Sequence, residues 1–395
     1  MDEHGDNEQV RIARHEQGPL VSVCVVRPRL REFHVTAAPR VSVGANNAAA
    51  QTREAYEALV SWLREQEAVG VQERVFGSLS RREAILAARE EAVRDQPDLG
   101  LRAPTFVEGA PCAREGLAGV HVYAVAGPSC RPVHHGGRCC GAAFEHRGTR
   151  HVHLSGLEGP AAAGGRREAA AAMFARADET LRGLGGSYAD VVRTWIYLAD
   201  ILDWYEQFNE ARSAFHSRVV PAGSTGSRWL PASTGIEGRP PGGAHCTMDL
   251  VALGGAGRAN VRVEALHNPL QSEAYSYGSD FSRGVSVAFE GAETVYVSGT
   301  AAIDEHGQSV CAADLPGQVH RTLDNIASLL STRRMTLDDV ASSTIFVKEG
   351  QDASVVRKLI EERGGGLAHG VYLTADVCRP ELLFEADGVA VRVAR

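Results

Sequence analysis

The hydrophobic pattern of the chain switches repeatedly between the two-residue period of a strand and the longer period of a helix. Residues 151–156 form an apolar run that ends in Ser155-Gly156, which predicts a strand. The next segment is rich in alanine and predicts a helix with one apolar face, formed by Met173, Phe174, Ala177, Thr180 and Leu181. A β-branched and aromatic run up to Leu198 predicts a second strand. A second helix is predicted from the spacing of Trp204, Phe208, Ala211 and Phe215, before a third strand at 246–253.

The same order recurs in the last third of the chain. It predicts strands at 294–299, 342–348, 371–375 and 382–393 and helices at 315–330 and 353–363. A fainter copy is predicted near the start, with strands at 32–36 and 71–76 and helices at 53–66 and 81–93. Such repetition fixes the unit of folding. We therefore expect an α+β protein of tandem β-α-β-α-β domains at residues 126–258 and 259–395, preceded by an α/β domain at 1–125 that we interpret as a degenerate copy.

Charge narrows the classes of partner. The chain has 41 basic and 49 acidic residues, a net charge of −8, which is unfavourable for binding nucleic acid or an anionic membrane. Its only lysines are Lys348 and Lys358, so nearly all the basic residues are arginines. Because arginine holds a carboxylate in a bidentate fork, this composition favours a small anionic substrate.

The sequence contains few signals for targeting, membrane insertion or cofactor binding. No run of about 18 apolar residues is present, and the first residues, Met1 to His4, are acidic where a secretory signal is basic and then apolar. Eight cysteines are too few for a disulfide scaffold, so we predict a cytoplasmic protein with free thiols. No nucleotide-binding glycine motif or hydrolase elbow occurs, which predicts that no cofactor is used.

One cluster of side chains contains potential zinc ligands: His134, His135, Cys139, Cys140, His146, His151 and His153. Adjacent cysteines do not form the usual zinc knuckle, and no Cys-x-x-Cys is present. We therefore predict no metal here and interpret the segment as a glycine-rich surface loop with incidental histidines.

Glu385 is the strongest candidate for acid chemistry. It lies in the apolar run Leu382 to Ala386, and strand alternation puts it on one face with Leu383 and Asp387. Apolar surroundings and a like charge both favour the protonated carboxyl, as a general acid requires. The alternative is a solvated carboxylate on an edge strand.

The two clear copies resemble the Rid (YjgF) family, in which small domains form trimers with sites between subunits. Within that superfamily the last two domains are most similar to the chorismatase branch, which removes the enolpyruvyl group of chorismate as pyruvate. The segments that carry this similarity begin at Arg193 (RTWIY), Pro231 (PASTGI), His267 (HNPLQ), Phe281 (FSR), Val297 (VSGTAAI) and Ala375 (ADVCRPELLFE).

The resemblance implies roles for individual residues. Glu385 would be the general acid, and Gly299 with Cys378 matches the pair found in relatives that make 3-hydroxybenzoate. From its surroundings, Cys378 could also be a thiol activated by the neighbouring Arg379, or simply a small buried apolar residue. The residues expected to bind substrate are Arg193, Arg212, Arg283, Tyr275, Tyr277, Gly299 and Thr300. The three arginines could converge on a dicarboxylate, although each alone could equally form a surface salt bridge.

We therefore expect a cofactor-free enzyme of biosynthetic, secondary metabolism that releases pyruvate from chorismate or a related enol ether, giving a 3-hydroxybenzoate-type product. The expected assembly is a monomeric pseudo-trimer or a homo-oligomer. Two departures from the family pattern touch the pocket wall: a short segment between Tyr275 and Phe281, and Trp195-Ile196-Tyr197 in place of Trp-Asn-Tyr. They keep open a Rid-type lyase, cyclase or imine/enamine deaminase acting on another small anion, and a non-catalytic binding protein. Serine at position 233, where Rid deaminases have arginine, disfavours the deaminase.

Overall fold

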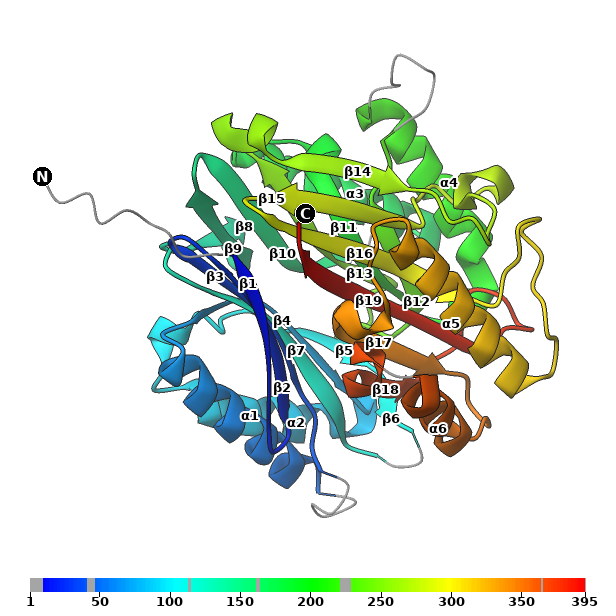
Figure 1. The fold of residues 1–395 in the computed structure, drawn as a ribbon, viewed down its shortest axis with the longest axis horizontal. Coiled ribbons are helices and arrows are strands. Elements are labelled where there is room, and N and C mark those ends of the chain that lie inside the picture. Colours follow the sequence, from blue (N-terminus) through cyan, green and yellow to red (C-terminus); the bar gives the residue numbers. More distant parts are fainter. Residues whose placement is uncertain are drawn as a thin grey trace, which may run out of the picture.

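The computed structural model describes residues 10–40, 47–112, 115–160, 164–220, 229–363 and 365–394. The acidic first residues, Met1 to His4, lie outside these ranges. Three β-sheets, each with two helices on its outer face, form the molecule (Figure 1). We name the sheets and their helices the first, second and third units, in chain order.

The first unit contains the strands β1 (Arg11–Gln17), β2 (Leu20–Arg27), β3 (Leu30–Ala37), β4 (Val69–Gly77), β5 (Thr105–Glu108) and β7 (Leu117–Ala126), with α1 (Ala48–Glu65) and α2 (Arg82–Val93). The second contains β8 (Arg131–His135), β9 (Arg138–His146), β10 (Thr149–Gly159), β11 (Val191–Leu198), β12 (Ala232–Glu237) and β13 (Cys246–Gly254), with α3 (Arg166–Gly183) and α4 (Ile201–Val219). The third contains β14 (Arg262–Leu266), β15 (Gly284–Phe289), β16 (Ala292–Ala301), β17 (Val340–Val347), β18 (Val371–Thr374) and β19 (Phe384–Val393), with α5 (Leu315–Ser331) and α6 (Ala353–Arg363).

The three sheets share one strand order. In the second sheet it is β12-β11-β13-β10-β9-β8, and the third repeats it as β18-β17-β19-β16-β15-β14, with the short β6 (Ala110–Pro111) added at its edge. The first sheet repeats it as β5-β4-β7-β3-β2-β1. The first unit is therefore a third copy of the same fold, and the chain is an α+β pseudo-trimer. Because β6 pairs with β18, the first unit also extends the third sheet.

Two predictions about these units were incomplete or wrong. Each unit begins with a pair of antiparallel strands that the β-α-β-α-β pattern omitted, β8 and β9 in the second unit. The predicted glycine-rich loop is in fact this hairpin together with β10, and His151 and His153 are buried in it. The tight Gly136-Gly137 turn supplies the glycines, both at positive φ.

The sheets meet face to face, and the helices lie outside (Figure 1). A central apolar core draws residues from all three units, among them Phe76, Trp195 and Val389. The opposite face of each sheet packs on its own helices, as α3 and α4 do through Phe174 and Phe208. Burial on both faces explains why the central strands are almost continuously apolar. No helix in the described ranges is long and apolar enough to cross a membrane.

Candidate active site

A cavity of about 650 Å³ lies between the second and third units. Its walls come from α4, from β12, from the segment between β14 and β15, from β16 and from the end of β18 to β19. The lining residues central to its chemistry are Tyr205, Ser233, Tyr277, Phe281, Arg283, Gly299, Cys378, Arg379 and Glu385. A cavity of this size suits a small organic ligand.

Glu385 lines this cavity and lies on β19. That strand runs between β16 and β17, so Glu385 is in the middle of a sheet and the edge-strand alternative is wrong. Only 4% of its surface is exposed. Burial, with a smaller contribution from Asp387, raises the pKa of Glu385 to about 8. The carboxyl is therefore protonated at neutral pH and can donate a proton into the cavity.

Gly299 makes room for this carboxyl. It lies on β16, where the pairing with β19 shifts register between Val297 and Thr300. Such a bulge re-aims the backbone. A Cβ atom on Gly299 would overlap Glu385 Oε1. The absence of a side chain at this position is thus a condition for the observed position of the acid.

Asp387 is held by the neighbouring unit. Its Oδ2 accepts hydrogen bonds from Arg193 Nη2 at 2.9 Å and from Thr234 Oγ1 at 2.7 Å. Arg193 is fully buried and also lies over the ring of Trp195, 4.5 Å from its centroid. Burial lowers the pKa of Arg193 to about 10, which leaves it charged at neutral pH. Arg193 therefore joins two units behind the cavity and does not line it.

Arg283 and Arg379 supply the positive charge of the cavity wall. Arg283 donates from Nε and Nη2 to Ser272 O and from Nη2 to Tyr277 Oη. Arg379 donates from Nη1 to Gly307 O and Ser309 Oγ. Both guanidinium groups lie over the Tyr277 ring. These contacts fix the two arginines while leaving donors for a ligand carboxylate.

The remaining predicted residues are arranged differently. Arg212 is buried beside the cavity, over Phe281, and donates to Asn209 Oδ1. Thr300 is buried and donates to Ser298 O. Tyr275 is 56% exposed and does not line the cavity, because residues 274–277 form a 3₁₀ turn and not an alternating strand.

Cys378 lines the cavity beside Glu385. Burial, and secondarily the charge of Glu385, raises the pKa of Cys378 to about 12 despite the adjacent Arg379. The thiol is protonated at neutral pH, so the idea of a thiol activated by Arg379 is not supported. The geometry supports a role for Cys378 in shaping the cavity next to Glu385.

The wall formed by α4 and Arg379 was not predicted from the sequence. Tyr205, Asn209 and Ser213 all line the cavity and recur at every fourth residue, a signal that the sequence does contain. The helical geometry of α4 breaks at Trp204, whose indole donates to Ala199 O. Arg379 directly follows Cys378 within a segment that the resemblance had already singled out.

Only one of the three units carries the acid. Asp249 on β13 is equivalent to Asp387 on β19. Asp249 pairs with β11 at the same register at which Asp387 pairs with β17. Each also accepts a hydrogen bond from a threonine hydroxyl of the preceding unit. Two residues earlier, β13 has Thr247 where β19 has Glu385. The pseudo-symmetry therefore repeats the scaffold of the site but not its chemistry.

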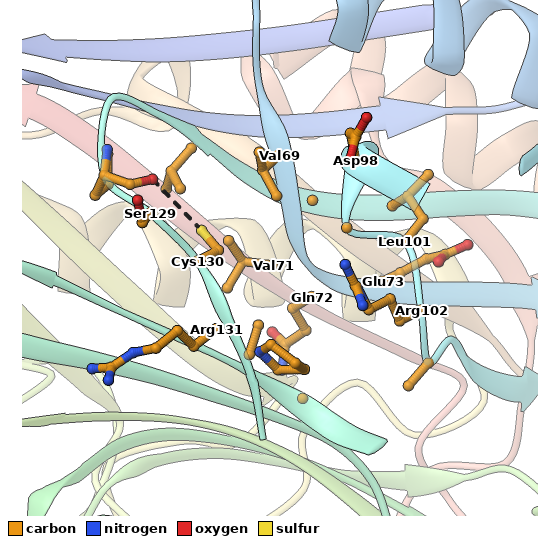
Figure 2. Close-up of a pocket in the computed structure, with 18 of the residues that line it drawn as sticks. Val69, Val71, Gln72, Glu73, Asp98, Leu101, Arg102, Ser129, Cys130 and Arg131 are labelled. Carbon is orange, nitrogen blue, oxygen red and sulfur yellow. Dashed lines mark hydrogen bonds between the residues drawn. The ribbon is translucent and has the colours of Figure 1, made fainter. Parts of the chain in front are cut away.

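A second cavity, of about 430 Å³, lies between the first and second units. Figure 2 shows Cys130 and Arg131 on one side of it and Leu101 and Arg102 on the other. None of the residues predicted for catalysis or substrate binding lines it. In the described ranges, no three His, Cys, Asp or Glu side chains are grouped as metal ligands, and His146 instead pairs with Glu290 at 2.6 Å.

Comparison with known proteins shows the family of this chain. The family model described as Endoribonuclease L-PSP matches residues 279–390. A chorismatase of Streptomyces rapamycinicus is 30% identical over 253 residues, which are 57% of this chain and 71% of that protein. The chain belongs to the chorismatase family.

Two further relatives fit this assignment. A 3-hydroxybenzoate synthase of Streptomyces hygroscopicus is 27% identical over 252 residues, covering 57% of this chain and 69% of that protein. A crystal structure of chorismatase aligns with a TM-score of 0.59 at 21% identity, over 82% of this chain and 93% of that one. The structural match supports the shared chorismatase fold across most of the chain, the first unit included.

Proposed function

We propose that this protein is a chorismatase-type enzyme that releases pyruvate from chorismate or a closely related enol ether and leaves a 3-hydroxybenzoate-type product. The observation that carries the proposal is Glu385, a buried carboxyl that is protonated at neutral pH and faces a cavity with two arginines in its wall. Membership of the chorismatase family and the relatives' names support the same reaction.

The chemistry starts with proton transfer. Glu385 would protonate the terminal methylene of the enolpyruvyl group, which leaves an oxocarbenium ion and a glutamate carboxylate. Water or a ring oxygen then attacks the oxocarbenium carbon, and collapse of the adduct breaks the bond to the ring oxygen and releases pyruvate. Chorismate contains the atoms of one pyruvate and one hydroxybenzoate, so any water that adds is lost again when the ring aromatises. No redox partner is required.

Other residues would position the substrate. Arg283 and Arg379 are placed to bind its carboxylates, because both line the cavity and keep donors available. Tyr277 supports both guanidinium groups. Gly299 and Cys378 would set the position of the ring relative to Glu385, while Arg193 and Arg212 would act from behind the wall. Tyr275 and Thr300 would contribute only indirectly.

The test is direct. Purified protein mixed with chorismate should release pyruvate, measured with a coupled reductase, together with an aromatic acid identified by chromatography. A Glu385→Gln variant with an unchanged melting temperature should release pyruvate at a rate at least about 100-fold lower. If the wild-type protein is folded and releases no pyruvate from chorismate, the chorismate assignment is wrong.

A second candidate is the same acid chemistry on a different small anionic enol ether. The short segment before Phe281 favours it, since this segment turns Tyr275 out to solvent and leaves Tyr277 to line that wall. Imine deamination has less support, because Ser233 lies where deaminases have an arginine and is bonded to Thr194 Oγ1. Screening other enol ethers for pyruvate release would distinguish chorismate from a different enol ether as the substrate.

We further propose that residues 1–125, 126–258 and 259–395 are the three domains, and that one chain supplies a complete pseudo-trimer. The three equivalent sheets support this division. The residues that line the candidate site come from the second and third units of one chain, which supports a complete site in a monomer. Light scattering coupled to gel filtration should then give a mass near 42.2 kDa, and a trimeric mass would contradict the proposal.

A further inference from the structure

A small cavity lies where the three sheets meet, separate from the candidate active site. Its volume is about 30 Å³. The polar residues that line it come from all three units: His34, Gln72, Arg74, His121, Tyr123, His153, Tyr296 and Ser342. A buried water needs roughly 10–15 Å³ and two or more polar partners, so the space is sufficient for one small polar species.

Arg74 brings a positive charge to this cavity. Only 8% of its surface is exposed, and its guanidinium lies 3.9 Å from the centroid of the Trp195 ring. Its Nη1 is buried and has no hydrogen-bond partner among the described residues. No ion pair in the described ranges joins it directly to a carboxylate, and Asp249 is the acidic group that interacts with it electrostatically. A buried charge without a direct counter-charge is costly, which suggests that a ligand completes the site.

His153 offers a second unused group. It is 2% exposed and stacks on Tyr123, with 4.5 Å between the ring centroids. Its Nδ1 has no partner among the described residues. Burial holds the pKa of His153 well below its ordinary value, so the ring is neutral and does not repel Arg74. The neutral ring can donate from Nδ1 when that nitrogen carries the proton.

Three carboxylates of the surrounding strands have partners of their own outside the cavity. Glu32 is bound by Arg27 and accepts from Tyr123 Oη, and Asp387 is bound by Arg193. Asp249 accepts through Oδ1 from Thr105 Oγ1 and Gly156 N, and the charge of Arg74 partly offsets the effect of burial on its pKa. None of these three lines the cavity. The lining of the cavity thus includes a cation but no acidic side chain.

From this arrangement we propose that the central cavity binds a small monatomic anion of the chloride class, held by Arg74 Nη1 and His153 Nδ1. The anion would neutralise Arg74 and join the three units at their common axis. This site is independent of the proposed reaction, because it shares no lining residue with the cavity around Glu385.

Bromide provides the first test. Crystals of the full chain soaked in sodium bromide, measured at the bromine absorption edge, should show an anomalous peak within hydrogen-bond distance of Arg74 Nη1. Density for a water molecule without an anomalous peak would overturn the proposal. This experiment uses the unmodified protein, so it does not depend on any variant folding.

Thermal unfolding provides the second test. At constant ionic strength, replacing sodium gluconate by sodium chloride should raise the melting temperature of the wild-type protein by about 2 °C or more, since an anion that binds only the folded state stabilises it. Arg74→Gln should lose this shift, and Arg131→Gln, a variant at a 74% exposed arginine, should keep it. If Arg74→Gln does not fold, His153→Phe, which keeps a ring against Tyr123, replaces it. An equal chloride shift in the cavity variant and in the wild type would overturn the proposal.

Discussion

Glu385 Oε1 occupies the space that a methyl group on Gly299 would fill. A Gly299→Ala variant should therefore push the carboxyl out of its observed position. We expect a loss of at least about tenfold in kcat, because even a small displacement of a reacting group is costly. Steady-state pyruvate release from the enol ether identified in the functional assay measures this effect.

Gly235 provides the matched control. It lines the same cavity on β12, and a Cβ atom there would lie 3.6 Å from Tyr205, an ordinary contact. Gly235→Ala should therefore narrow the cavity and affect KM more than kcat. An equal loss of kcat in both variants would show that the smaller cavity volume, and not the contact with Glu385, lowers the kcat of the Gly299 variant.

The pH dependence of the reaction should follow the protonation of Glu385. The general acid works in its protonated form, and its pKa in the folded protein is about 8. We expect kcat/KM to be constant below that pH and to fall about tenfold per unit above it. A rate that instead falls as the pH drops from 8 toward 6 would assign the limiting group to a base.

The same carboxyl should also affect stability. Its folded pKa lies above the ordinary glutamate value of 4.5, so the folded protein retains a proton that the unfolded chain loses. This contribution is present below pH 4.5 and is lost as the pH rises to about 8, on the order of 1.4 kcal/mol per unit. Glu385→Gln lacks it. The unfolding free energy of the variant, relative to wild type, should therefore increase between pH 4.5 and 8, as measured by urea unfolding.

The local part of the site could be predicted from the sequence, and the assembled part could not. Alternation along one strand is enough to place Glu385 and Asp387 on one face, and helical spacing is enough to bury Phe174 and Phe208. The pairing of Arg193 with Asp387 joins residues 194 positions apart and depends on how two units pack. No periodicity carries that information, so Arg193 was expected in the cavity and not behind it.

Asp387→Asn should separate positioning from catalysis. Loss of this carboxylate leaves Arg193 buried with one fewer counter-charge, which should destabilise the protein by about 3–5 kcal/mol. The negative charge of Asp387 also contributes to the raised pKa of Glu385. The descending limb of the pH–rate profile should therefore move to lower pH. Thr234→Val, which removes a neutral donor to the same oxygen, should leave the limb in place or move it upward.

Cys378 should not behave as a nucleophile. Its pKa of about 12 keeps the thiol protonated, and thiolate is the form that reacts with alkylating reagents. Iodoacetamide at pH 7.5 should modify the exposed Cys311 well before Cys378, as peptide mass spectrometry can show. Cys378→Ser should retain turnover within about tenfold. Complete loss of activity in a folded Cys378→Ser variant would restore a chemical role for the sulfur.

Buried histidines should make the fold sensitive to acid. Burial lowers the pKa of His34 to about 4 and those of His121 and His151 to about 3, from 6.5. The unfolded chain therefore takes up protons that the folded chain does not. The contribution of these histidines to stability is complete above pH 6.5 and is lost as the pH falls toward 3, each histidine contributing on the order of 1.4 kcal/mol per unit.

His151 offers the cleanest variant for this effect. It stacks on Phe144 with 4.5 Å between centroids and an interplanar angle of 10°, and its Nε2 has no partner among the described residues. His151→Phe keeps the stacked ring and removes the titrating group. Its melting temperature should therefore fall less than that of the wild type between pH 6.5 and 4.5. His306→Gln, at a 78% exposed position, should track the wild type. If the melting temperature of His151→Phe also follows that of the wild type, protonation of His151 does not contribute to acid unfolding.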